Sequence, residues 1–144
     1  MKGQVVPILA SVVTGSVVGI LSVVYIARFF GASRLIQDSL VPKSVTVPIA
    51  VTISENIGGE TSITSVVVFV VGIFGALIGF SLMRLLHIDD PVARGLAMGS
   101  AAHGIGTARS IEKGAVEGAL SGLAMALMGV CTALLAPVIA RFLY

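Results

Sequence analysis

Three long stretches of this chain contain no charged side chain, at residues 3–27, 61–83 and 118–140. Each is at least 23 residues long, and a helix needs about 20 apolar residues to cross the hydrocarbon core of a bilayer. A backbone inside lipid must satisfy its own hydrogen bonds, so each stretch is predicted to be a transmembrane helix. The first stretch follows Met1 and Lys2, but it exceeds the ~7–15 apolar residues of a secretory signal, and we expect it to be retained.

A shorter charge-free stretch, residues 44–54, lies between the first two predicted spans. Pro42 and Pro48 disfavour helix in the residues that precede them, and Gly58-Gly59 supplies a stop. The stretch is therefore predicted to be a broken helical segment at about residues 42–58. Broken backbone at membrane depth is tolerated only where it is buried in protein or lines a watery cavity.

The second short stretch, residues 95–108, precedes the third predicted span. Gly104 and Gly106 each cost a helix roughly 1 kcal/mol relative to alanine, so the backbone is expected to loosen there. We predict a second broken segment at about residues 91–110. A matched pair of interrupted short segments is typical of transporters, whose half-helix ends face the substrate.

The pattern predicts an all-α fold, a single polytopic transmembrane domain over residues 1–144 that resembles transporters. Each broken segment is followed by a polar, glycine-containing turn and then by a full span, so the two halves form a weak internal repeat. If both broken segments are re-entrant hairpins, the chain crosses three times and the two repeats have opposite orientation. If both segments cross, there are five crossings and the repeats run parallel. The positive-inside rule favours crossing, whereas inverted repeats, which re-entrant hairpins would give, are the common transporter pattern; both alternatives stay open. Crossing places six cations on one side and three on the other: Arg28, Arg34, Lys43, Arg84, Arg94 and Arg141 against Lys2, Arg109 and Lys113.

Composition supports a membrane protein. Hydrophobic residues make up 56% of the chain and charged residues 11%, whereas soluble domains average about 45–50% and about 25%. The single cysteine, Cys131, excludes a disulfide scaffold. A net charge of +2 without a basic cluster is too small for a nucleic-acid partner.

Three motifs resemble the LrgB/CidB family of membrane proteins, and the resemblance extends over essentially the whole chain. They are VPKSVTVPIA at residues 41–50, DPVARGLAMGSAAHGIGTAR at residues 90–109 and EGALSGLAM at residues 117–125. Family members are usually longer, with a hydrophobic N-terminal portion that this chain lacks, and many carry Thr-Thr-Pro where this chain has Thr46-Val47-Pro48.

The resemblance implies two functions. Bacterial relatives are described as holin-like or antiholin-like regulators of murein hydrolase activity and autolysis that act with a smaller LrgA/CidA-type membrane protein. Relatives are also linked to pyruvate movement, and a plastid relative exchanges glycolate and glycerate. We expect a bacterial inner-membrane, multi-pass protein in a transport pathway for small monocarboxylates; the alternative is the antiholin-like regulator.

A monocarboxylate site requires a cation or N–H donors, together with hydroxyl groups. Ser44 and Thr46 are N-cap residue types just before Pro48, where a helix can restart. Lys43 and Arg109 border the two breaks. Each of them either supplies the positive charge that pairs with the substrate carboxylate or marks a membrane interface. We expect substrate contacts from both segments: Lys43, Ser44, Thr46, Pro48, His103, Gly104, Gly106, Thr107 and Arg109.

His103 lies in an uncharged, glycine-rich stretch and is the candidate for proton coupling, because intramembrane ionisable groups are usually functional. Its alternative role is structural, as a neutral imidazole bonded to a carbonyl freed by Gly104 or Gly106. Glu55 and Asn56 are further candidates for proton or cation coupling, or form a solvated loop.

No catalytic, metal-binding or cofactor motif is present, so an enzyme is not expected. Nothing in the sequence arranges a nucleophile, and the Cys and His spacing fits no metal site. The expected partners are the lipid bilayer, a small carboxylate, and either further copies of this chain or an LrgA/CidA-like protein. Self-association or a partner is expected because three spans hardly seal a solute pathway alone.

Overall fold

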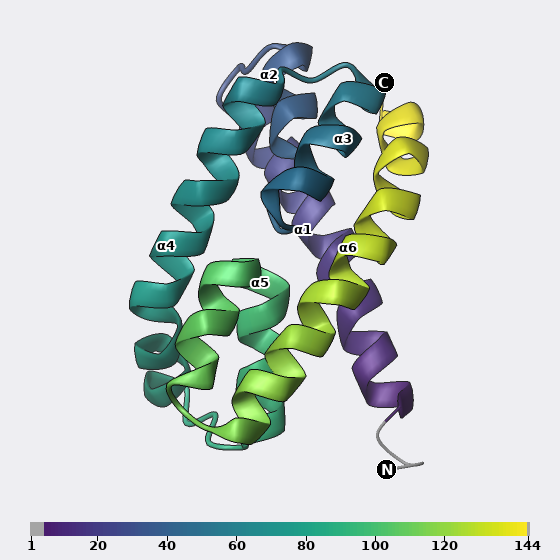
Figure 1. The fold of residues 1–144 in the computed structure, drawn as a ribbon. Coiled ribbons are helices and arrows are strands. Elements are labelled where there is room, and N and C mark those ends of the chain that lie inside the picture. Colours follow the sequence, from purple (N-terminus) through teal and green to yellow (C-terminus); the bar gives the residue numbers. More distant parts are fainter. Residues whose placement is uncertain (1–4, 144) are drawn as a thin grey trace.

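The computed structural model describes residues 5–143, and within this range the chain forms six helices (Figure 1). They are α1 (Val5–Phe29), α2 (Arg34–Leu40), α3 (Val47–Ile57), α4 (Thr61–Leu85), α5 (Pro91–Ile111) and α6 (Ala115–Leu143). Helices α1, α4 and α6 are long and apolar enough to cross a membrane. They lie where the three charge-free stretches predicted spans, which confirms the all-α transmembrane fold. Residues 3–4 of the first predicted span, and Lys2, lie outside the described residues.

Helix α5 reverses direction within its length. His103 has φ 40° and ψ −130°, which breaks the helix into two halves. Both halves pack on one residue of α6: a Cβ on Gly99 would lie 2.1 Å from the Ser121 carbonyl oxygen, and the Thr107 hydroxyl lies 2.9 Å from the Ser121 hydroxyl. Eight residues of straight helix would separate positions 99 and 107 by about 12 Å. The two halves therefore lie side by side as a helical hairpin (Figure 1).

Helices α2 and α3 form another hairpin, which enters the bundle from the opposite end (Figure 1). In chain order, the α2–α3 hairpin is the first hairpin and the hairpin within α5 is the second. The end of α2 contacts the segment after α3. Gly59 lies so close to Ser39 that a Cβ added to it would be 2.8 Å from the Ser39 nitrogen. The connection between them, residues 41–46, reaches the middle of α1, where a Cβ on Gly19 would lie 3.7 Å from the Ser44 hydroxyl oxygen. This is the re-entrant, oppositely oriented arrangement. The five-crossing alternative, which the charge distribution favoured, would require each broken segment to continue through the bundle, whereas this structure folds each of them into a hairpin.

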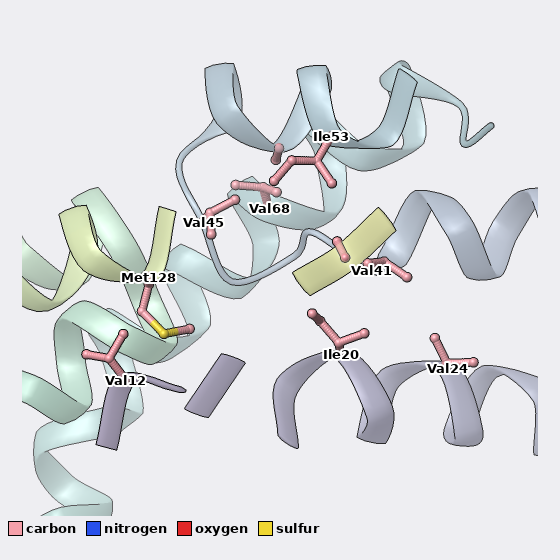
Figure 2. Close-up of a cluster of buried hydrophobic side chains, with 10 residues drawn as sticks. Val12, Ile20, Val24, Val41, Val45, Ile53, Val68 and Met128 are labelled. Carbon is pink, nitrogen blue, oxygen red and sulfur yellow. The ribbon is translucent and has the colours of Figure 1, made fainter. Parts of the chain in front are cut away.

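The hydrophobic core holds the tip of the first hairpin in the centre of the bundle. Val45, in the connection between α2 and α3, is fully buried. It belongs to one cluster with Val12 of α1, Val68 of α4 and Met128 of α6 (Figure 2). Because four elements meet at Val45, the irregular backbone on either side of it is fixed by packing.

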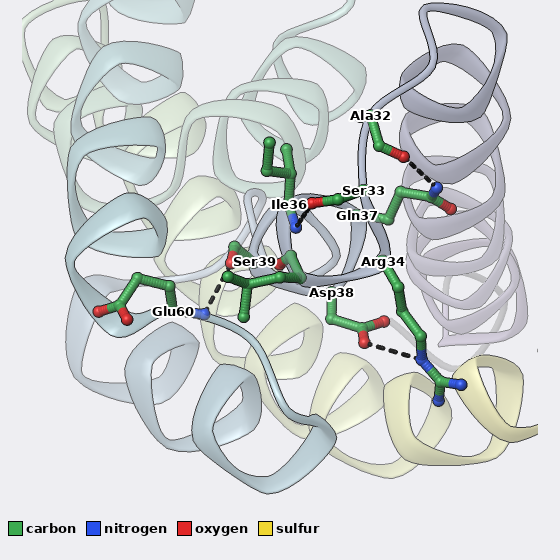
Figure 3. A network of polar contacts seen from close by, with 9 residues as sticks. Ala32, Ser33, Arg34, Ile36, Gln37, Asp38, Ser39 and Glu60 are labelled. Carbon is green, nitrogen blue, oxygen red and sulfur yellow. Dashed lines mark hydrogen bonds and ion pairs between the residues drawn. The ribbon is translucent and has the colours of Figure 1, made fainter.

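A buried polar cluster, formed by Ser39, Ser54 and Thr64, closes the open end of the α2–α3 hairpin. The Thr64 hydroxyl lies 2.9 Å from the Ser39 carbonyl and 2.7 Å from the Ser54 hydroxyl. The Ser39 hydroxyl accepts a hydrogen bond from the Glu60 N–H at 2.7 Å (Figure 3). These bonds join α2, α3 and α4 at a point where all three side chains are excluded from solvent.

Helix ends follow the sequence signals closely. Asp90 caps α5 by accepting a hydrogen bond from the Ala93 N–H at 2.8 Å, and Pro91 opens the first turn. Gly58 ends α3 with φ 90°, a conformation that favours glycine. Glu60 caps α4, and hydrogen bonds from Ser62 lower the pKa of its carboxyl group.

Candidate functional site

The tip of the first hairpin places one cation inside the bundle. Lys43 is half-buried, and its Nζ donates a hydrogen bond to the Ser44 hydroxyl at 3.1 Å. Among the described residues, none of the ion pairs involves Lys43. Charged groups inside a protein are normally paired, so a half-buried ammonium without a carboxylate can receive an anion.

The start of α3 adds a second positive feature beside Lys43. Thr46 is the N-cap residue, but its side chain makes no capping hydrogen bond. The N–H groups of the first turn therefore lack the side-chain acceptor that an N-cap usually provides. The partial positive charge of a helix N-terminus favours an anion at the same place. Pro48, in that first turn, is exposed and faces a groove between α3 and α6.

His103 lies at the tip of the second hairpin and faces α4. Its Nε2 is 2.9 Å from the Val68 carbonyl oxygen, and the residue is 4% exposed. The ring comes this close because position 72 is glycine: a Cβ there would lie 2.6 Å from the His103 Cε1. The imidazole thus makes the kind of carbonyl bond considered as its structural role, although the carbonyl belongs to α4 and not to the broken segment.

The break in α5 falls on His103 itself and not on the neighbouring glycines. Neither Gly104 nor Gly106 has a positive φ. Gly106 is instead required by packing, because a Cβ there would lie 2.7 Å from the Met98 carbonyl oxygen in the other half of the hairpin. The expectation that Gly104 and Gly106 loosen the backbone is therefore corrected: one is exposed, and the other allows the two halves to touch.

Thr107 fastens the second half of α5 to α6. Its hydroxyl donates to the His103 carbonyl at 2.8 Å and lies 2.9 Å from the Ser121 hydroxyl. This contact stabilises the helix immediately after the break. Ser121 did not emerge from the sequence pattern, although its place in the glycine-rich run of α6 is a signal for close packing.

Three predicted site residues lie away from both tips. Arg109 is exposed and pairs with Glu112. Glu55 and Asn56 are exposed near the end of α3, at the open end of the first hairpin. Glu55 and Asn56 lie in the last turn of α3, where a solvated loop had been the alternative to a role in coupling.

Val68 links the two hairpin tips. Its side chain packs in the core cluster beside Val45 of the first tip (Figure 2), and its carbonyl accepts the bond from His103 of the second. Sequence analysis missed both Val68 and Gly72. Gly72 carried a signal, because it lies three residues before Gly75 on the face of α4 that packs against α5. Within residues 5–143, no group of His, Cys, Asp and Glu side chains is placed to hold a metal ion.

Comparison with known proteins identifies related sequences. Residues 1–142 match the profile of the LrgB-like family. The uncharacterized protein YwbG of Bacillus subtilis (strain 168) is 38% identical over 143 residues, which cover 99% of this chain and 64% of the relative. The antiholin-like protein LrgB of Bacillus cereus (strain B4264) is 34% identical over 136 residues, covering 94% and 59%. This chain thus spans about three fifths of the length of these curated relatives. No solved structure matches it.

Proposed function

Because this chain belongs to the LrgB-like family, we propose that it forms part of a transport pathway for small monocarboxylates of the pyruvate, glycolate or glycerate class. The proposed location is a bacterial inner membrane, which the chain enters as a multi-pass protein. No catalytic step is part of this proposal. The observation that carries it is Lys43, a half-buried cation without an ion-pair partner among the described residues, at the tip of a re-entrant hairpin.

The chemistry at this tip suits a small hydroxy- or keto-acid. The Lys43 ammonium pairs with the carboxylate, and the Ser44 hydroxyl, 3.1 Å from Nζ, bonds the substrate's 2-oxygen. The uncapped first turn of α3 stabilises the same negative charge. These groups come from one short segment, so a shift of the hairpin tip would move them together, as alternating access requires.

The second hairpin supplies the proposed coupling group. His103 occupies a backbone conformation that strains any residue except glycine by about 1–3 kcal/mol, and such strain is retained mainly at functional positions. We therefore keep proton coupling as its proposed role. The bond to Val68, which packs beside Val45, connects a protonation change at His103 with the first tip.

Transport by this chain requires further protein. Three long helices with two hairpins enclose little space, and the chain spans about three fifths of its curated relatives. We propose that the pathway is completed by further copies of the chain, by an LrgA/CidA-like small membrane protein, or by both.

Uptake of labelled pyruvate into proteoliposomes, with and without an LrgA-like protein, tests the proposal. We expect saturable uptake that glycolate competes with, and the variant Lys43→Gln should weaken it about 10–100-fold, the usual loss for a charged hydrogen bond. Lys113→Gln is the matched control, because Lys113 is exposed at the far end of the bundle and should leave uptake unchanged. Arg109→Gln measures whether Arg109, the second cation predicted to contact the substrate, contributes to uptake. Equal uptake by the Lys43 variant and the Lys113 variant would contradict the carrier.

His103→Gly separates the two roles of the imidazole. Glycine relieves the positive φ, so a stably folded variant is expected even though the Val68 bond is lost. If His103 couples proton movement, the variant retains substrate binding and loses the pH dependence of uptake. An unchanged pH profile would leave His103 with a structural role only.

The second candidate function is an antiholin-like regulator of murein hydrolase activity. The names of relatives favour it, since several Bacillus proteins that match this chain at 34% identity are named antiholin-like protein LrgB. A regulator should alter autolysis in cells that also contain an LrgA/CidA-like protein. In liposomes it should show no saturable pyruvate uptake and be indifferent to Lys43→Gln.

A further inference from the structure

Two hollows adjoin on the surface between α3 and α6. The first is an apolar groove of about 310 Å³, lined by Pro48, Ile49, Thr52, Ile53, Asn56, Ala133 and Pro137. The second, of about 220 Å³, has a polar rim and is lined by Arg34, Asn56, Ile57, Pro137, Ala140 and Arg141. Because Asn56 and Pro137 line both, they form one continuous depression, apolar toward the hairpin tip and polar at the end of the bundle.

The polar end of the depression is lined by two arginines, Arg34 and Arg141. Arg141 is exposed in the last turn of α6 and makes none of the ion pairs found among the described residues. Arg34 has a side chain that is 63% exposed and pairs with the buried Asp38 at 3.4 Å (Figure 3). Because Arg34 already pairs with Asp38, the exposed Arg141 is the cation on which the binding of an anion at this end depends.

The apolar end has the length of one bilayer leaflet. From Asn56 to Pro48, α3 advances eight residues, or about 12 Å. Half of a hydrocarbon core of roughly 30 Å is about 15 Å. A groove that begins at two arginines and continues over this depth matches a lipid, whose phosphate lies at the interface and whose acyl chain extends inward. A free small anion would leave the groove unoccupied.

We propose that this depression binds one anionic phospholipid of the surrounding bilayer. Its phosphate lies between Arg141 and Arg34, and one acyl chain lies along α3 and α6 as far as Pro48. The site adjoins the proposed carboxylate site, whose charged and hydroxyl groups are Lys43 and Ser44, because Pro48 lines the groove. Since Pro48 belongs to the first turn of α3, a bound chain rests against the tip of the α2–α3 hairpin.

The test uses the full 144-residue chain in a neutral detergent, titrated with phosphatidylglycerol or with phosphatidylcholine of the same acyl chains. Binding is read by native mass spectrometry and by the rise in Tm. We expect saturable binding of one phosphatidylglycerol and much weaker binding of phosphatidylcholine. Arg141→Gln should weaken the binding of phosphatidylglycerol about fivefold, the effect of one interfacial arginine. Arg84→Gln, in the last turn of α4 at the other end of the bundle, should leave it unchanged.

A second pair of variants tests the acyl-chain groove. Ala133→Phe fills the groove, whereas Ala126→Phe adds the same ring at another exposed alanine of α6 that does not line it. Only the first should weaken phosphatidylglycerol binding. The proposal is overturned if both rings act alike, if Arg84→Gln weakens binding as much as Arg141→Gln, or if soluble glycerol 3-phosphate binds as tightly as the lipid. The last result would assign the arginines to a free anion.

Discussion

The imidazole of His103 reaches the Val68 carbonyl because Gly72 has no side chain. The ring occupies the space where a Cβ would lie, with Cε1 and Nε2 at 2.6 and 2.9 Å from that position. The bond joins the tip of one hairpin to the helix that supports the other. A single missing methyl group therefore determines whether the two tips are connected.

Gly72→Ala should destabilise the protein by about 1–3 kcal/mol, the usual cost of overpacking a filled site. The added methyl group displaces the imidazole and leaves the buried His103 without its carbonyl bond. The matched control is Gly122→Ala, since nothing lies within 4 Å of a Cβ at that position; it should be neutral or stabilising by up to about 1 kcal/mol. Thermal unfolding in detergent measures both. Equal Tm values for the two variants would show that the His103 contact has no energetic importance.

Sequence reasoning placed the second break one to three residues from its position in the structure, at Gly104 and Gly106 and not at His103. Gly104 and Gly106 were the natural candidates, because glycine is the residue that tolerates positive φ at least cost. The structure places the positive φ on His103, whose ring is held by α4. That choice depends on a tertiary contact between positions 35 residues apart, and local composition contains no trace of it.

Helix α2 shows how a short element is maintained by its neighbours. It has seven residues, fewer than the roughly 12–15 that an isolated helix needs to be even marginally stable in water. Its last turn is held by Ser39, whose carbonyl and hydroxyl bond to Thr64 and Glu60. The open end of the first hairpin therefore depends on hydrogen bonds from the start of α4.

Thr64→Val should loosen this hairpin while leaving α4 intact. Valine keeps the shape but leaves the Ser39 carbonyl and Ser54 hydroxyl without their partner, at about 1–3 kcal/mol. We expect faster hydrogen exchange across α2 and α3, measured by mass spectrometry. Ser65→Ala is the control, because the Ser65 hydroxyl bonds only to the Thr61 carbonyl of its own helix. Uniformly faster exchange across all six helices would indicate global destabilisation in place of a local effect.

Elements with a strong apolar pattern were predictable, and those that depend on partners were not. The spans at 3–27, 61–83 and 118–140 correspond to α1, α4 and α6, and the segment at 91–110 corresponds to α5. The segment at 42–58 captured α3 and the connection but not α2, which begins at Arg34. With Arg34 and Asp38 in seven residues, α2 has the local composition of a loop.

The whole molecule consists of two hairpins that enter from opposite ends and meet helices that cross completely (Figure 1). Cations then lie at both ends of the bundle: Arg28, Arg34 and Arg141 at one, and Arg84, Arg94, Arg109 and Lys113 at the other. With cations divided almost evenly between the two ends, the positive-inside rule does not by itself decide between three and five crossings. The rule compares the Lys and Arg content of the loops on the two sides of the membrane. Both ends of a re-entrant hairpin lie on the same side, so the charges that flank it are counted on that side.

Labelling of single cysteines with a membrane-impermeant maleimide distinguishes the two arrangements in intact cells and in inverted vesicles. In a Cys131→Ala background, Leu35→Cys and Glu55→Cys flank the first hairpin, while Asp89→Cys and Glu112→Cys flank the second; all four positions are exposed. Re-entrant hairpins predict that the first pair reacts from one side and the second pair from the other. Crossing segments predict that the members of each pair react from opposite sides. The latter result would separate Lys43 and His103 from a common central region, and the transport proposal would lose its geometric basis. Agreement with the hairpins would leave the Lys43 and His103 variants as the tests of what that region binds.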